Sequence, residues 1–171
     1  GCFGGKINRL KIDTIFAGQG SSATNLGIFM GKGKEHLDFT TNMYHNAENT
    51  TNDVLVEGIM KDESTSVYRG LIRIPKEGQK TNSYLANHIL KLGDKTLANS
   101  IPSLKIDAND VKASHGATVG QINDEHLFYL MARGLSKTEA QNLIVEGFFE
   151  PIIQKIPSEE IRDKIRELVG K

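Results

Sequence analysis

Apolar and polar side chains alternate along most of the chain before residue 120. In residues 68–74, apolar or small side chains occupy the even positions, and arginines occupy two of the odd positions. The same alternation recurs in residues 84–92, 104–108 and 111–119, and more weakly at 37–39 and 54–56. A period of two is typical of strands with one buried face. Breakers rich in Gly, Pro or Ser separate these segments at 18–22, 31–34, 75–78 and 93–94.

Many short strands with regular turns predict a sandwich, a barrel or a solenoid. Thr, Asn and Ser are frequent in residues 40–42 and 49–52. Such residues suit the corners of a β-solenoid, where like neighbours hydrogen-bond from coil to coil. No strict repeat period emerges, however, which argues against a simple solenoid code. The pattern alone therefore favours solenoid and sandwich equally.

The period changes to that of helices after residue 120. Asn123 or Asp124 can cap a helix over the apolar residues of 127–131, which Gly134 ends. Ser136 and Glu139 have the spacing of a capping box. Ser158 opens a last helix, with its apolar residues on one face. We therefore expect a β domain over residues 1–120 and a C-terminal helical subdomain over 121–171.

Composition removes several classes of function. Lys plus Arg and Asp plus Glu both number 21, so no basic field for nucleic acid exists. Apolar runs of only a few residues are too short for a membrane span, and no signal-peptide pattern opens the chain. Cys2 is the only cysteine, which excludes an internal disulfide and a cysteine-only metal site. We expect a cytoplasmic protein and, because the chain does not begin with Met, a fragment of a longer one.

Signs of enzyme chemistry are weak. The Gly-rich segments do not fit the phosphate-binding pattern G-x-x-x-x-G-K-[ST], so the chain is not itself an ATPase. No H-E-x-x-H motif and no carboxylate pair on one strand supports hydrolysis. His36 and His45 lie in a polar stretch without metal-ligand spacing, and we expect both on the surface.

His115 is the candidate metal ligand. It falls on the same strand face as Val111, Ala113, Ala117 and Val119. A histidine on an apolar face is commonly a core or interface residue, but it can also present an imidazole to soft or borderline metals. The small residues beside it leave room for another chain or a ligand.

The segment around His115 resembles a known family. Residues 110–120, D-V-K-A-S-H-G-A-T-V-G, resemble the D-V-K-x-S-H-G-A-T-V-G motif of SufD proteins. Residues 124–134, D-E-H-L-F-Y-L-M-A-R-G, resemble the D-E-x-x-F-Y-x-x-x-R-G helix shared by SufB and SufD. Two further segments resemble the family, residues 99–106 and the Arg69-Gly70 strand. The likeness extends over about residues 50–170.

This resemblance implies a mainly β fold, a right-handed parallel β-helix followed by helices. It also implies a scaffold rather than an enzyme. SufB and SufD chains pair through their β-helices, as homodimers or heterodimers, and dock the ABC-type ATPase SufC with their C-terminal helices. The complex builds iron–sulfur clusters. Iron or a nascent cluster would then be held transiently at the dimer interface, and not stably by this chain alone.

Two departures favour the SufD side of the family. SufB chains carry a cysteine on the preceding strand, where our alignment places Asn87, and a glutamate after the motif histidine, where this chain has Gly116. The resemblance then makes His115 the contribution to the shared interface. A single chain that forms homodimers is the alternative.

Two surfaces are expected to bind partners. The small residues Ala113, Gly116 and Ala117 allow a partner strand to approach closely. The C-terminal helices offer more apolar surface than they can bury against each other, which predicts the ATPase-docking residues Leu143, Ile144, Phe148 and Phe149. Two alternatives remain: a solenoid enzyme acting on polysaccharide, and a purely structural dimerisation module.

Overall fold

The alternation of side chains in the first part of the sequence produces a series of strands. A computed structural model of the chain describes residues 1–170. Nine strands lie in this range: β1 (Cys2–Phe3), β2 (Ile7–Phe16), β3 (Ser22–Gly31), β4 (His36–His45), β5 (Thr51–Met60), β6 (Thr65–Ile74), β7 (Asn82–Lys91), β8 (Leu97–Ile106) and β9 (Lys112–Gln121). The breakers expected from the sequence fall in the connections between these strands, except that Ser22 and Gly31 are the end residues of β3.

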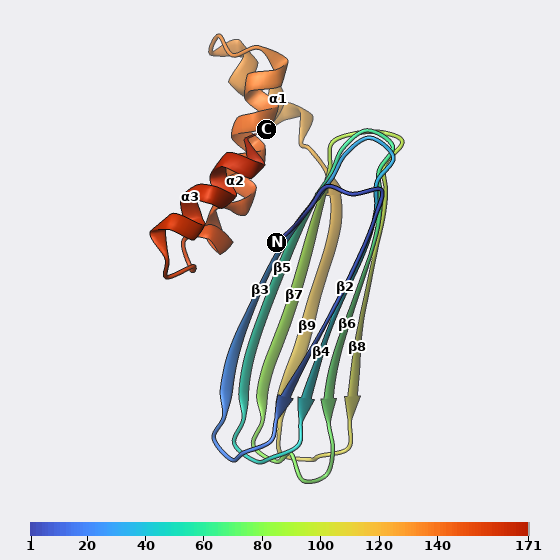
Figure 1. Cartoon of the computed structure of the whole chain (residues 1–171), viewed down its shortest axis with the longest axis vertical. Coiled ribbons are helices and arrows are strands. Elements are labelled where there is room, and N and C mark those ends of the chain that lie inside the picture. The colour runs from blue at the N-terminus through green and yellow to red at the C-terminus, as the bar shows by residue number, and fades with distance from the viewer. Residues whose placement is uncertain (171) are drawn as a thin grey trace.

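The strands form two parallel sheets that face each other (Figure 1). The odd sheet has the order β1-β3-β5-β7-β9 and the even sheet the order β2-β4-β6-β8. From β2 onward, register partners in neighbouring strands lie 29 to 32 residues apart in sequence. One strand from each sheet makes a coil, and four coils stack into a solenoid. The prediction of a mainly β, parallel solenoid followed by helices is confirmed.

Aromatic rings from successive coils fill the solenoid interior. Phe29, Phe39 and Tyr68 are almost fully buried, and their ring centroids lie 6.0 and 6.2 Å apart. The Tyr68 hydroxyl is bonded to the hydroxyl of Thr41 at 2.7 Å, which satisfies a polar group that would be costly to bury alone. Burial raises the pKa of Tyr68 to about 12. In this largely apolar interior, the Tyr68 and Thr41 hydroxyls thus satisfy each other.

The expectation that His45 lies on the surface is wrong. It is fully buried, and its ring stacks on Phe16 with centroids 4.3 Å apart. Its Nδ1 and Nε2 atoms contact the hydroxyls of Thr50 and Ser83 at 2.8 and 3.2 Å. Burial lowers the pKa of His45 to about 4, so this imidazole is neutral at physiological pH. The polar residues near 49–52 thus line a corner, as the sequence suggested, and accommodate an imidazole there.

Three helices follow the last strand: α1 (Asp124–Ala132), α2 (Lys137–Ile153) and α3 (Glu159–Val169). Their predicted starts are confirmed, because Asn123, Ser136 and Ser158 each accept a backbone N–H at the helix N-terminus. Ser136 and Glu139 form the predicted capping box. Gly134 follows the end of α1 with a positive φ, a conformation in which glycine is unstrained.

The helices cover only one side of the solenoid. They lie against the outer face of the odd sheet, toward the ends of β3 and β5, and leave the even sheet uncovered (Figure 1). The contact is apolar, with Phe149 and Ile152 of α2 packed in one cluster with Ile28 and Ile59 of the sheet. None of the helices among residues 1–170 is long and apolar enough to span a membrane.

Two glycines, one beside the aromatic core and one in α2, provide a test of how closely these regions are packed. Gly58 lies in β5 beneath the ring of Phe29, and a methyl group there would overlap that ring. Because Phe29 is itself fixed by the aromatic core, we expect Gly58→Ala to destabilise the fold by about 1–3 kcal/mol. Gly147 lies in α2 with no atom near the position of an added methyl group, so Gly147→Ala should stabilise by about 0.5–1 kcal/mol.

Urea unfolding of the two variants and the unchanged protein measures these free energies. An equal effect of both substitutions would contradict the packing described for Phe29.

Candidate functional site

The last coil of the solenoid is open. Strand β9 pairs with β7, and β8 pairs with β6, but among the described residues no further strand pairs with either. The free edges of β8 and β9 therefore present unpaired backbone groups, which a second chain can bind by adding a strand.

His115 lies on this coil with its side chain on the interior face. Its register partner is Leu85, which is fully buried inside the solenoid. Side chains of adjacent parallel strands in register share a face, so His115 continues the interior row of β7. His115 is nevertheless exposed, because the interior is not covered beyond this coil within residues 1–170. An imidazole thus stands at the open end of an apolar core.

Two of the predicted contact residues share this face with His115, and the third does not. Ala113 and Ala117 pair with the buried interior residues Ser83 and Asn87. Gly116 pairs with Ala86 and faces outward, where an added methyl group would meet the Tyr84 hydroxyl at 3.2 Å. The three residues therefore lie on the same edge strand but on opposite faces of it.

Asn87 occupies the position at which the sequence comparison expected a cysteine in related chains. Its side chain is fully buried and donates to the Val56 carbonyl oxygen at 3.0 Å. It also accepts a bond from the Ser100 hydroxyl at 2.6 Å, which joins β7 to β8. Both ends of the amide are satisfied, so Asn87 holds the last two coils together and is not available as a ligand.

The described residues do not assemble a complete metal site around His115. No group of three or more His, Cys, Asp or Glu side chains in residues 1–170 is placed to hold a metal ion. His88, the histidine of the neighbouring strand, lies on the outer face and contacts the Thr118 hydroxyl through Nδ1 at 2.8 Å. Because iron sites need several ligands, a site at His115 requires side chains from outside residues 1–170.

The predicted docking residues of α2 differ in how exposed their side chains are. Leu143 is exposed, and Ile144 and Phe148 are half-buried. Phe149 is fully buried against the odd sheet, which corrects its prediction as a surface contact. The sequence pattern of α2 identified an apolar helix, but only the packing against β3 and β5 determines which apolar residues remain accessible.

Sequence reasoning missed the exposed aromatic residues of α1. Phe128 is 74% exposed, and Tyr129 is also exposed, with the Arg133 guanidinium 4.6 Å from its ring centroid. The Phe-Tyr pair in the helix motif was the available signal. The apolar residues of 127–131 predict a helix but not its buried face, and α1 buries only Leu127.

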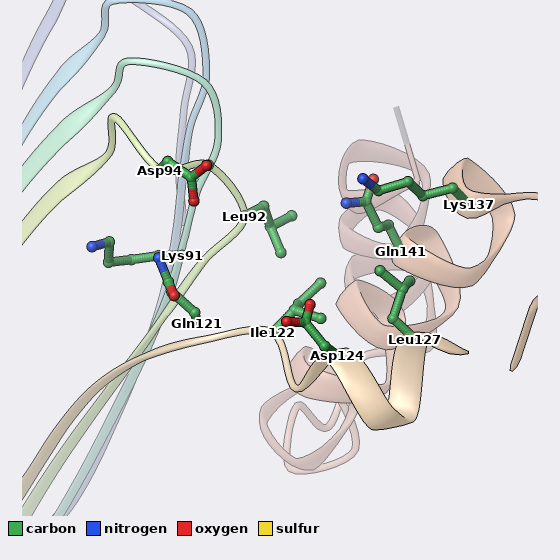
Figure 2. A pocket seen from close by; sticks show the side chains of 10 residues that line it. Lys91, Leu92, Asp94, Gln121, Ile122, Asp124, Leu127, Lys137 and Gln141 are labelled. Atoms are coloured by element: carbon green, nitrogen blue, oxygen red, sulfur yellow. The ribbon is translucent and has the colours of Figure 1, made fainter. Parts of the chain in front are cut away.

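A polar cleft separates the last coil from the start of the helices (Figure 2). It has a volume of about 380 Å³ and is lined by the turn after β7, the linker after β9, and α1 and α2. Side chains of both charges line it, including Lys91, Asp94, Asp124 and Lys137. The cleft contains none of the predicted site residues. It marks the junction at which the chain leaves the solenoid through Ile122 and Asn123.

Comparisons with known proteins agree with the motifs around His115. The family model described as "SUF system FeS cluster assembly, SufBD core domain" matches residues 1–148. The iron-sulfur cluster assembly protein SufD of Bacillus subtilis is 31% identical over 156 residues, which cover 91% of this chain and 36% of that protein. SufD of Escherichia coli is 31% identical over 167 residues, which cover 98% of this chain and 40% of that protein.

A SufBD family protein of Staphylococcus saprophyticus is 32% identical over 160 residues, covering 93% of this chain and 34% of that protein. The chain thus spans about a third of the length of the curated relatives it matches.

Proposed function

This chain belongs to the SufBD core family of the SUF system for FeS cluster assembly, and from that premise we propose that it is the SufD-type part of a cluster-assembly scaffold. In this proposal the chain pairs with a second SufB- or SufD-like chain through the terminal coil. Iron or a nascent iron–sulfur cluster is the cargo, and an ABC-type ATPase of the SufC kind docks on the helices. The cytoplasmic location stays a prediction.

One observation carries the proposal: His115 is exposed on the interior face of an open terminal coil and has no companion ligands in the described chain. A surface of this kind is incomplete by itself. Pairing with a second solenoid would cover the interior row, give hydrogen-bond partners to the unpaired backbone groups of β9 and supply further ligands to iron. The imidazole would then act as one ligand of a site shared by two chains.

The two alternatives from the sequence have less support. A polysaccharide enzyme needs free carboxylates on one sheet, but Asp38 and Asp13 of the even sheet pair with Arg9 and Lys11. A purely structural dimerisation module would use the same terminal coil without iron. Iron content of the assembled complex distinguishes that module from a scaffold.

The pairing surface is tested by Ala117→Glu. A charge on the interior row of β9 would be buried and unpaired in the complex, so we expect dissociation into single chains with at least about a tenfold weaker association. Ala117 is exposed in the single chain, and the fold should persist. Thr24→Glu, on the exposed outer face of β3, is the matched control. Sedimentation of the full-length protein with its partner gives the result, and an unchanged dimer would place the interface elsewhere.

The metal role is tested by His115→Ala in the assembled complex from iron-replete cells. Dimerisation should persist, while cluster content and iron affinity fall by about tenfold or more, because even supporting residues around a metal contribute on that scale. His126→Ala, an exposed histidine of α1, should leave both quantities unchanged. Iron and sulfide content per chain is the measurement. Unchanged content in His115→Ala would make His115 a structural interface residue.

The helical docking surface is tested by Leu143→Asp rather than by removal of the helices. Deleting residues 136–171 would expose the apolar outer face of the odd sheet, which Phe149 and Ile152 cover, and so would confuse misfolding with lost docking. Leu143 is 50% exposed, so its replacement should spare the fold and reduce ATPase co-purification several-fold. Ile15→Asp, on exposed β2, is the control. Undiminished co-purification of the ATPase with Leu143→Asp would show that this face of α2 is not the docking surface.

A further inference from the structure

The contact between the helices and the solenoid is apolar and limited in extent. Val145, Phe149, Ile152 and Ile153 of α2 and Val169 of α3 pack in one buried cluster with Ile28, Met30 and Ile59 of the odd sheet. The covalent connection is the short linker at Ile122 and Asn123, beside the polar cleft (Figure 2). The position of the helices therefore depends mainly on this cluster, with the linker as the hinge.

A carboxyl group lies within this apolar contact. Glu57 is on the outer face of β5, in register between Ile28 of β3 and His88 of β7. It is only 5% exposed, and its Oε2 atom is buried without a hydrogen-bond partner. A buried carboxylate without hydrogen bonds is strongly disfavoured, whereas the neutral acid costs much less to bury. Docked helices therefore favour the protonated form of Glu57.

The charged groups around Glu57 do not neutralise it. On the neighbouring strand β3, Ile28 carries no charge. On β7, the Nδ1 atom of His88 contacts the Thr118 hydroxyl. On its own strand, Asp53 attracts Lys155, whose Nζ lies 3.9 Å from the Asp53 carboxylate. Lys155, just after α2, is the cation that favours the ionised form of Glu57.

Three further charged groups of the neighbouring helices, Glu146, Glu150 and Arg166, line a separate pocket between α2 and α3. Arg166 bonds to Glu150 there at 2.8 Å.

The balance of these effects favours the neutral acid. Burial raises the pKa of Glu57 to about 7, even though Lys155 acts in the opposite direction. If the helices moved away, solvent would reach the carboxyl group and its pKa would return toward the ordinary value of 4.5. The docked arrangement thus binds a proton that the undocked arrangement releases, so docking weakens as the pH rises from about 4.5 through 7.

We propose that Glu57 is a proton-controlled latch between the solenoid and the helices. When Glu57 is protonated, α2 and α3 stay packed on the odd sheet. When it ionises, the buried charge destabilises the apolar contact, and the helices detach about the linker at Ile122 and Asn123. This inference concerns the junction of the two subdomains and does not depend on iron or on the pairing of terminal coils.

Amide hydrogen exchange of the full-length protein, corrected for intrinsic exchange rates, tests the latch. Between about pH 6 and pH 8 we expect the protection factors of residues 145–153 to fall about tenfold, as the linkage relation gives for a pKa near 7 in the docked arrangement. Strand β6, which lies between β4 and β8 in the even sheet, should keep its protection over the same range, because the hydrophobic core that it contributes to does not include Glu57. An unchanged protection of α2 across this range would overturn the proposal.

Neutral substitutions complete the test. In Glu57→Gln, and independently in Glu57→Met, the protection of α2 should be high and independent of pH, since neither side chain can ionise. Asp53→Asn removes the carboxylate that competes for Lys155 but not Glu57, so the pH dependence should persist and shift toward lower pH. A pH dependence that persists in both Glu57 variants would assign it to another group and refute the latch.

Discussion

The in-register pairing of each coil with the next is the constraint on which the rest of the structure depends. Each strand bonds to a strand about 30 residues away, so a slip by one residue would move every interior side chain to the outside. The Phe29, Phe39 and Tyr68 rings penalise such a slip, because a shifted strand would place them in solvent. This register also puts His115 on the interior row and Glu57 on the outer one.

The period of two predicts strands β4 to β9 at least in part, but it does not reveal β3, in which residues 26–31 are all apolar or small. It does not distinguish a solenoid from a sandwich, and the reason lies in the connections. Offsets of 29 to 32 residues between partners let the turn lengths vary, so no repeat is visible although the coils stack. The family motif supplied the solenoid, while periodicity and the small neighbouring residues already marked His115 as the candidate residue.

What the sequence could not predict depends on contacts between distant segments. His45 looks like a surface residue among polar neighbours, but Phe16 and Ser83 from other strands enclose it. Phe149 looks like part of an exposed apolar face until the odd sheet covers it. The sequence gives no sign of Glu57, because an acidic residue in a strand gains significance only when a helix from 90 residues later packs over it.

Two buried ionisable groups give this fold opposite responses to pH. His45 has its pKa lowered to about 4, so its burial stabilises the fold above 6.5 and loses this effect as the pH falls toward 4. Glu57 has its pKa raised to about 7, so its burial is most favourable below 4.5 and becomes unfavourable as the pH rises toward 7. Between pH 4.5 and 6.5 the free energy of unfolding rises with pH because of His45 and falls because of Glu57. The two effects oppose each other, so a measurement on the whole chain does not separate them. Only a local measurement distinguishes a group in the solenoid core from one beneath the helices.

The two faces of the odd sheet keep the junction and the terminal coil apart. Glu57, His88 and Thr118 form one outward row that runs from beneath the helices to the edge strand β9. His115 and Ala117 lie on the same edge strand but face the interior. Because opposite faces of a strand are separated by its backbone, each surface can be altered by substitution while the other keeps its contacts.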